Sequence, residues 1–254
     1  MPLRLVVVYG SVRSDRQGIR AARFIVNECR MRGHEVTLID PLEYPLPLLD
    51  KMYKEYPKGR APEILERLAA LIVPADGVVV VSGEYNHSIP PALSNLLDHF
   101  LEEWFWKPSA IVCYSAGSFG GVRAAMQLRM MLAELGMVSI PSLFPVPRVQ
   151  EAFAEDGTPT DTTMRTRVKK FLEELEWYAE ALRSCGRFRC VRGGGTGGEG
   201  GLSRRRPPRK QLDAISSPAP RPWSGTPNRT PRAPLVSSRS PTRRNDRRSR
   251  PDTG

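Results

Sequence analysis

Cysteine is scarce in this sequence. There are four cysteines among 254 residues, and no two of them form a Cys-x-x-Cys pair. This usage argues against a disulfide framework and indicates a reducing compartment, so we expect a cytoplasmic protein. Cys29 and Cys113 fall inside apolar patterns and are expected to be small buried side chains. No carboxylate or cysteine stands at metal-ligand spacing from His34 or His99, so no metal site is expected.

Long apolar runs are also missing. No stretch reaches the length of a membrane span, so we expect no membrane association. The apolar run near the N-terminus is only a few residues long and lacks a basic region and a cleavage site, so it does not predict a signal peptide.

The net charge of +11 is distributed unevenly along the chain. Residues 186–254 hold 17 of the 38 Lys and Arg residues but only 4 of the 27 acidic ones, so residues 1–185 are close to neutral. The 186–254 segment is rich in Gly, Pro, Ser and Arg and has no apolar period. It cannot bury enough surface to offset its chain entropy. We therefore predict a folded domain over 1–185 and a disordered basic tail over 186–254.

Two interpretations of this tail stay open. Arg-rich disordered segments bind nucleic acid or anionic surfaces through phosphate contacts. The tail has only one aromatic residue after Phe188, which is Trp223, so a base-stacking platform is poorly supported. The alternative is an extension that adds charge without specificity.

The first 185 residues alternate between apolar runs and helical patterns. Strands are predicted at residues 3–8, 34–39, 77–82 and 109–114, and in a segment that begins after 136–140. Helices are predicted over 19–29, 62–72, 91–104, 121–135 and 161–182. Five strands that alternate with five helices predict an α/β fold with a parallel sheet covered on both faces. Ligands bind such sheets beyond the carboxyl ends of the strands.

A Pro- and Tyr-rich connection covers residues 41–60. Its prolines, among them Pro45, Pro47 and Pro57, exclude a long regular element. A loop of this length inside a compact domain is usually functional or part of an interface.

The loop after the first strand, Ser11 to Gly18, has the character of a phosphate site. Gly-Lys-Ser/Thr does not follow Gly10, which disfavours nucleoside triphosphate hydrolysis, and the dinucleotide pattern Gly-x-Gly-x-x-Gly is absent. What remains is a polar loop with hydroxyl and guanidinium donors that leads into a helix N-terminus. This combination suits a monophosphate. An ordinary solvated loop is the alternative.

Two more loops should reach the same edge of the sheet. Residues 82–90 (SGEYNHSIP) carry an aromatic ring, an amide and a carboxylate, and residues 114–121 (YSAGSFGG) carry three glycines that let a flat ligand approach the backbone. A phosphate cradle beside two backbone-lined walls describes a mononucleotide such as FMN.

Three motifs then resemble one family. GSVR after the first strand, EYNHSIPPALSNLLDH after the third and YSAGSFGGVRAAMQLR after the fourth are similar to the NADPH-dependent FMN reductases, which include azo, quinone and chromate reductases. The resemblance covers residues 3–183 and implies a flavodoxin-like three-layer sandwich that binds FMN noncovalently. One departure is Gly83, where the family more usually has proline.

The resemblance also implies a set of binding residues. In the family pattern Ser11, Arg13, Arg16, Gln17 and Gly18 hold the FMN phosphate. Glu84, Tyr85 and Asn86 lie against the flavin ring, and Ser115, Gly117, Gly120 and Gly121 border its other edge. Family members commonly assemble as dimers or tetramers, so a homo-oligomer is expected.

The function implied is hydride transfer from NADPH through FMN to a small acceptor: a quinone, an azo compound, chromate, a ferric chelate or free flavin. The flavin would carry the chemistry, so no catalytic side chain is expected. Arg16 and Arg123 are candidates for the cation that selects NADPH, and each is equally a candidate phosphate ligand of FMN or a solvated arginine. The alternative functions are a flavodoxin-like electron carrier and a flavin-binding sensor, neither of which oxidises NADPH.

Overall fold

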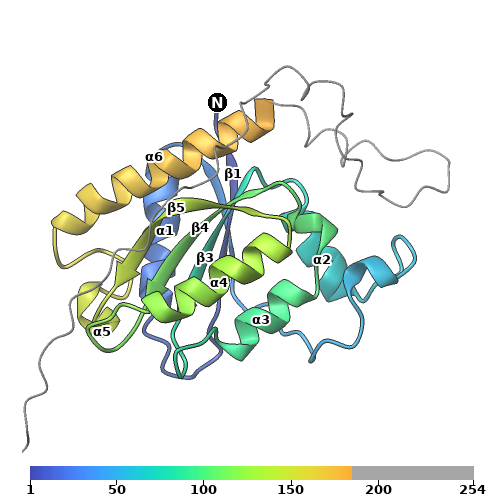
Figure 1. Cartoon of the computed structure of the whole chain (residues 1–254), viewed down its shortest axis with the longest axis horizontal. Helices are drawn as coiled ribbons and strands as arrows, with labels where there is room; N and C mark the ends of the chain where they lie inside the picture. Colours follow the sequence, from blue (N-terminus) through green and yellow to red (C-terminus); the bar gives the residue numbers. More distant parts are fainter. Residues whose placement is uncertain (185–254) are drawn as a thin grey trace, which may run out of the picture. The chain divides into compact units, whose positions relative to one another are not determined.

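A computed structural model describes residues 1–184; the predicted basic tail, residues 186–254, lies outside the described residues. Five strands form one sheet in the order β2-β1-β3-β4-β5, and every neighbouring pair is parallel. The strands are β1 (Arg4–Tyr9), β2 (Glu35–Ile39), β3 (Gly77–Gly83), β4 (Pro108–Tyr114) and β5 (Val138–Val146). This confirms the predicted flavodoxin-like sheet, which Figure 1 shows at the centre of the domain.

Helices cover both faces of the sheet, as predicted (Figure 1). One face packs against α1 (Ile19–Met31) and α6 (Thr163–Ser184), and the other against α2 (Glu63–Ile72), α3 (Pro91–Asp98) and α4 (Val122–Glu134). Successive residues of β1 alternate between the two cores, Val7 in one and Val8 in the other. A strand buried on both faces therefore reads as a continuous apolar run.

The third helix is shorter than its apolar pattern predicts. It ends at Asp98 instead of near Trp104, and a separate 3₁₀ turn covers Glu102–Trp104. The prediction was wrong because apolar periodicity reports burial and not backbone continuity. Trp104 is still fully buried: its indole Nε1 donates to the Leu97 carbonyl at 3.1 Å, so the side chain lies back against α3.

The 41–60 connection contains no α-helix or strand, only a 3₁₀ turn at Tyr53–Glu55. Asn95 on α3 anchors it, because its amide Nδ2 donates to the Pro47 carbonyl at 2.8 Å and its Oδ1 accepts from the Leu49 N–H at 2.9 Å. The Tyr53 hydroxyl donates to Glu66 on α2 at 2.8 Å. The absence of a long element from this connection agrees with its proline content.

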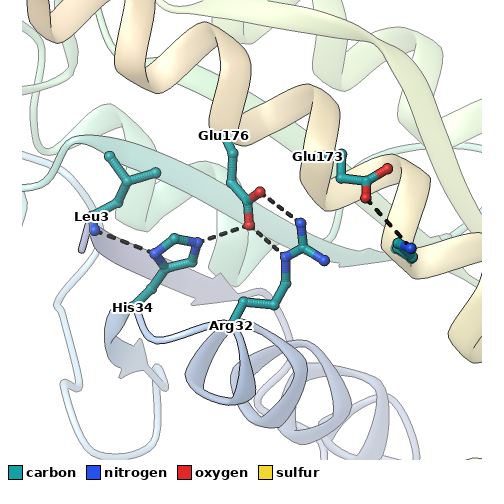
Figure 2. Close-up of polar contacts among 6 residues, drawn as sticks. Leu3, Arg32, His34, Glu173 and Glu176 are labelled. Atoms are coloured by element: carbon teal, nitrogen blue, oxygen red, sulfur yellow. Dashed lines mark hydrogen bonds and ion pairs between the residues drawn. The ribbon is translucent and has the colours of Figure 1, made fainter. Parts of the chain in front are cut away.

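A cluster of charged side chains fastens α6 at the amino ends of β1 and β2 (Figure 2). The Glu176 carboxylate accepts from the Arg32 guanidinium at 2.5 and 2.6 Å and contacts His34 Nε2 at 2.8 Å. His34 Nδ1 accepts the Leu3 N–H at 3.3 Å, so in the neutral ring the proton is on Nε2, facing Glu176. Arg32, His34 and Glu176 are called the amino-end clamp below.

The Glu176 carboxylate is held in its ionised form. Burial raises the pKa of Glu176, but the hydrogen bonds from Arg32 and His34 outweigh burial, so the net pKa is lowered. The clamp therefore stabilises the packing of α6 most when Glu176 is ionised.

The described cysteines are buried, as predicted. Cys29 and Cys113 have no exposed surface, and burial raises the pKa of each thiol to about 12. Thiols of this kind are inert. Among residues 1–184, no helix combines the length and the apolar character needed to cross a membrane.

Candidate cofactor site

The loops that follow β1, β3 and β4 meet at the carboxyl ends of these strands and enclose a cavity of about 350 Å³. Val149 and Gln150, at the start of α5 (Val149–Ala152), complete its wall. Eight of the twelve predicted binding residues line the cavity: Ser11, Arg13, Arg16, Gln17, Gly18, Glu84, Tyr85 and Ser115. The other four, Asn86, Gly117, Gly120 and Gly121, belong to the same loops but not to the cavity lining.

The loop after β1 presents a row of backbone donors. Within the described residues, the N–H groups of residues 14–18 have no acceptor, whereas those of Ile19 and Arg20 donate to loop carbonyls at 3.1 and 3.2 Å. The Arg13 side chain lines the same cavity, and no carboxylate of residues 1–184 pairs with it. Consecutive free N–H groups beside an arginine form the donor set that a phosphate monoester needs.

Arg16, in contrast, is already paired. Its guanidinium donates to Asp40, whose side chain is only 4% exposed, and its central carbon lies 5.6 Å from the centroid of the Tyr9 ring. Arg16 is therefore not a simple solvated arginine. Asp40 was not among the predicted site residues, although its position directly after β2 puts it at the same edge of the sheet.

Tyr114, the last residue of β4, forms the floor of the cavity. A Cβ atom on Gly18 would lie 2.0 Å from Tyr114 Cζ, and one on Gly83 would lie 3.1 Å from the same ring. Gly18 has φ −65°, which any residue adopts, so space and not backbone torsion requires glycine there. The Tyr114 hydroxyl donates to Tyr9 at 3.4 Å, and burial raises the pKa of both tyrosines.

This packing also accounts for the departure at position 83. Gly83 is the last residue of β3 and lies beside the Tyr114 ring. A larger residue would require that ring to move by a few tenths of an ångström. Tyr114 was not among the predicted binding residues. The feature that could have identified it is an aromatic residue at the end of a central strand.

The loop after β3 forms a tight hairpin turn. Tyr85 and Ser88 exchange two backbone hydrogen bonds, at 3.0 and 2.9 Å, around Asn86 and His87. Both central residues have positive φ, 50° and 64°, as a type I′ turn requires. Asn tolerates this conformation better than most residues, so Asn86 shapes the turn that presents Tyr85 to the cavity. The Tyr85 hydroxyl lies 3.1 Å from Ser11 Oγ.

The loop after β4 supplies further backbone donors. In the described part of the chain, the N–H groups of residues 116–121 have no acceptor. Gly121 has φ 78°, and a Cβ there would lie 2.6 Å from the Tyr114 carbonyl oxygen. Only glycine fits at this start of α4. Ser115 lines the cavity, and its hydroxyl donates to the Gly117 carbonyl at 2.9 Å.

Together these loops match the parts of a flavin mononucleotide. One wall offers unpaired N–H groups and a cation for a phosphate, and residues 83–85 and 114–116, at the ends of β3 and β4, form a second wall for a planar ring. The family comparison agrees with this geometry, because the model of the NADPH-dependent FMN reductases matches residues 3–151. The chain belongs to this family. Its members are NAD(P)H-dependent oxidoreductases, which implies FMN and NADPH as the cofactors of the chain.

Individual relatives support this membership. The chain is 30% identical over 147 residues to a 2-hydroxy-1,4-benzoquinone reductase of Burkholderia, covering 54% of this chain and 74% of the relative. It is 26% identical over 185 residues to an NADPH azoreductase of Bacillus, covering 72% and 99%. The solved structure of FerB, a flavoenzyme NAD(P)H:(acceptor) oxidoreductase from Paracoccus denitrificans, matches 69% of this chain and 98% of its own, with 26% identity and a TM-score of 0.56.

Proposed function

We propose that the protein passes a hydride from NADPH through noncovalently bound FMN to a small planar acceptor, with quinones and azo compounds as the first candidates. The observation that carries the proposal is the cavity at the carboxyl ends of the strands, where free N–H groups of residues 14–18 lie beside Arg13. The relatives named as quinone reductase and azoreductase support the acceptor classes.

The phosphate end of the cavity would hold the cofactor by directed donors. The N–H groups of residues 14–18 and the Arg13 guanidinium would bind the phosphate oxygens, and Ser11 Oγ would add a hydroxyl. Arg16 would contribute by position, because its ion pair with Asp40 fixes the end of the loop next to Gly18. Fixed donors need no rearrangement when a ligand arrives, which favours binding.

The ring end of the cavity would use backbone donors. The free N–H of Ala116, the one residue of 116–121 that lines the cavity, would face the ring edge, and Tyr85 and Tyr114 would bound the cavity from the turn and from the floor. Bound FMN supplies the hydride chemistry itself. The chain's own contribution is to hold the ring, to exclude water from one side of it and to stabilise the negative charge that reduction places on it.

An exposed aromatic ring in the loop after β4 favours flat acceptors. Phe119 is 64% exposed, and the Arg123 guanidinium lies 4.7 Å from the centre of its ring. An exposed aromatic ring offers a stacking surface to a flat acceptor such as a quinone, and the Arg123 guanidinium holds this ring in place from its other side. We infer that this surface, which belongs to the loop of residues 116–121, receives the acceptor.

An anaerobic titration tests the proposed function. The full chain is reconstituted with FMN and mixed with NADPH while flavin absorbance is followed, and a benzoquinone is then added. Loss of the flavin band with NADPH and its return with the quinone would support the proposal. A protein that binds no FMN would overturn it. Bound FMN that NADPH does not reduce would favour the flavodoxin-like electron carrier instead.

We also infer a homo-oligomer, from the exposed face of α4. Met126 and Met130 lie one turn apart there and are 48% and 68% exposed, and Phe119, in the loop before the helix, is 64% exposed. An apolar strip of this kind marks interaction surfaces more often than isolated exposed residues do. Sedimentation of the unaltered chain and of Met130→Glu measures the oligomeric state. If the unaltered chain is a dimer and Met130→Glu is a monomer, the strip is supported as the interface. If the unaltered chain is itself a monomer, this interface is excluded.

A further inference from the structure

The carboxylate of Glu84 is buried in the wall of the cofactor cavity and is bound by α4. Its side chain is 5% exposed and accepts from the Arg123 guanidinium at 2.5 Å. It also accepts from the backbone N–H groups of Arg123 and Ala124, at 3.1 and 3.4 Å. These two N–H groups belong to the first turn of α4, so Glu84 caps this helix from another loop.

Glu84 therefore places a fixed negative charge next to the cavity. Burial raises the pKa of Glu84, but its hydrogen bonds to Arg123 and to the Ala124 N–H outweigh burial and lower the pKa overall. Two features compensate this charge: the Arg123 guanidinium and the partial positive charge of the helix N-terminus. Of the two, Arg123 is the one that a substitution removes cleanly, since its side chain is 41% exposed and borders solvent.

A second contact joins α4 to the same loop without charge. The Gln127 amide Nε2 donates to the His87 carbonyl at 2.9 Å, and its Oε1 accepts from the Ser88 hydroxyl at 2.7 Å. Gln127 lies one turn beyond Arg123 on the helix. The turn of residues 85–88 is thus held at two points, one ionic and one neutral, so its position and its electrostatics are separable by experiment.

We propose that Glu84 and Arg123 act as an opposed pair that sets the reduction potential of FMN in this cavity. The inference rests on the proposed function, because it needs FMN to be bound. Two-electron reduction leaves additional negative charge on the flavin ring, and charges near the ring tune its potential. The Glu84 carboxylate disfavours the reduced ring, and Arg123 offsets this effect, so the balance between them positions the potential.

Four variants of the full chain test this balance. Arg123→Gln leaves the carboxylate without its cation, and we expect the affinity for reduced FMN to fall roughly tenfold relative to oxidised FMN, a potential about 30 mV more negative. Glu84→Gln keeps an oxygen acceptor for the α4 N–H groups but removes the charge, and we expect a shift of similar size in the positive direction. In the double variant, which combines Glu84→Gln with Arg123→Gln, the potential of bound FMN should be close to that of the unaltered chain. Arg123→Lys keeps the cation, so its potential should also be close to that of the unaltered chain.

Gln127→Ala is the matched control for loop position. It should weaken binding of oxidised and reduced FMN alike and leave the potential in place. The readouts are the Kd of oxidised FMN from fluorescence quenching and the midpoint potential from anaerobic titration against a reference dye. Thermal unfolding confirms that each variant is folded.

The outcomes separate the two proposals. If the unaltered chain binds no FMN, the proposed function fails and this inference with it. If FMN binds but the two single-charge variants shift the potential in the same direction, or neither shifts it, only the inference fails. A potential that moves as far in Gln127→Ala as in Arg123→Gln would show that loop position, not charge, is responsible, and would also overturn it.

Discussion

The two ends of the sheet use the same ionic chemistry for different results. At the amino ends of the strands, Glu176 joins Arg32 and His34 and ties α6 to the body of the domain. At the carboxyl ends, Asp40 pairs with Arg16 beside a cavity where, within residues 1–184, the N–H groups of residues 14–18 and the Arg13 guanidinium keep no protein partner. Satisfied polar groups stabilise the fold, whereas a binding site is recognised by the groups that the fold leaves free.

The largest expected effect comes from the floor of the cavity. Gly18→Ala puts a methyl group 2.0 Å from the present position of Tyr114 Cζ. Either the ring or the loop must move, so the free energy of unfolding should fall by about 3 kcal/mol and FMN binding should be lost. Chemical denaturation of the apo protein measures the first effect, and fluorescence titration the second.

Gly117→Ala is the matched control for stability, because a Cβ there meets no atom within 4 Å. Its free energy of unfolding should change by less than about 0.5 kcal/mol. Equal losses in the two variants would contradict the assignment of Tyr114 as the floor.

Arg13 should matter to binding and not to folding. Arg13→Ala removes a cation that no carboxylate of the described residues pairs with, so the Kd of FMN should rise about thirtyfold, equivalent to ~2 kcal/mol. Riboflavin, which lacks the phosphate, should bind the variant and the unaltered chain equally well. Isothermal titration with both ligands measures the difference, and an equal loss for riboflavin would place Arg13 away from the phosphate.

Glu176 should show the reverse behaviour. Glu176→Ala breaks the amino-end clamp and should lower the free energy of unfolding by about 1.5 kcal/mol while the Kd of FMN stays unchanged. Glu173→Ala, on the same helix (Figure 2), removes an exposed 3.9 Å contact with Lys169 and a weaker electrostatic interaction with Arg32, and should cost less than about 0.5 kcal/mol. A change in FMN affinity in Glu176→Ala would show that the two ends are coupled.

The smallest expected effect is a pH dependence of the clamp. The pKa of Glu176 in the folded protein lies below its ordinary value of 4.5, so its contribution to stability is present above that value and is lost as the pH falls through the folded pKa. The stability difference between the unaltered chain and Glu176→Gln should therefore narrow on acidification below about pH 4.5. Urea titrations measure the free energy of unfolding of both proteins. A difference between them that stays constant down to pH 3 would exclude the ionised Glu176 carboxylate as the source of the added stability.

The strands were the most predictable part of the fold. The sequence pattern placed β1, β2, β3 and β4 within two residues. For β1, β3 and β4 the signal was an apolar run, because a strand buried on both faces is apolar almost throughout, whereas the edge strand β2 is only partly buried. The apolar pattern gave the wrong end for α3, because Trp104 continues the helical spacing of apolar residues after the helix has ended at Asp98. Trp104 is buried because its side chain folds back against α3, and the spacing of apolar residues along the sequence does not reveal such a reversal.

The site was predictable as a set of loops but not as a set of contacts. Parallel topology brings the ends of β1, β3 and β4 together, so residues such as Ser11 and Ser115 were expected at one cavity. The partners across loops were not foreseen. Asp40 lies 24 residues from Arg16, and Tyr114 at the end of β4 meets Gly18 in the loop after β1, although β3 lies between these two strands in the sheet.

The support that Tyr114 gives to Gly18 has a consequence for rates. A loop held from below has its bound shape before the ligand arrives, so FMN should associate in one kinetic phase, first order in FMN. Encounter would then limit association, and differences between ligands or variants would appear mainly in the dissociation rate. The lifetime of the flavin on the protein would be set by how long its phosphate stays among the free N–H groups of residues 14–18.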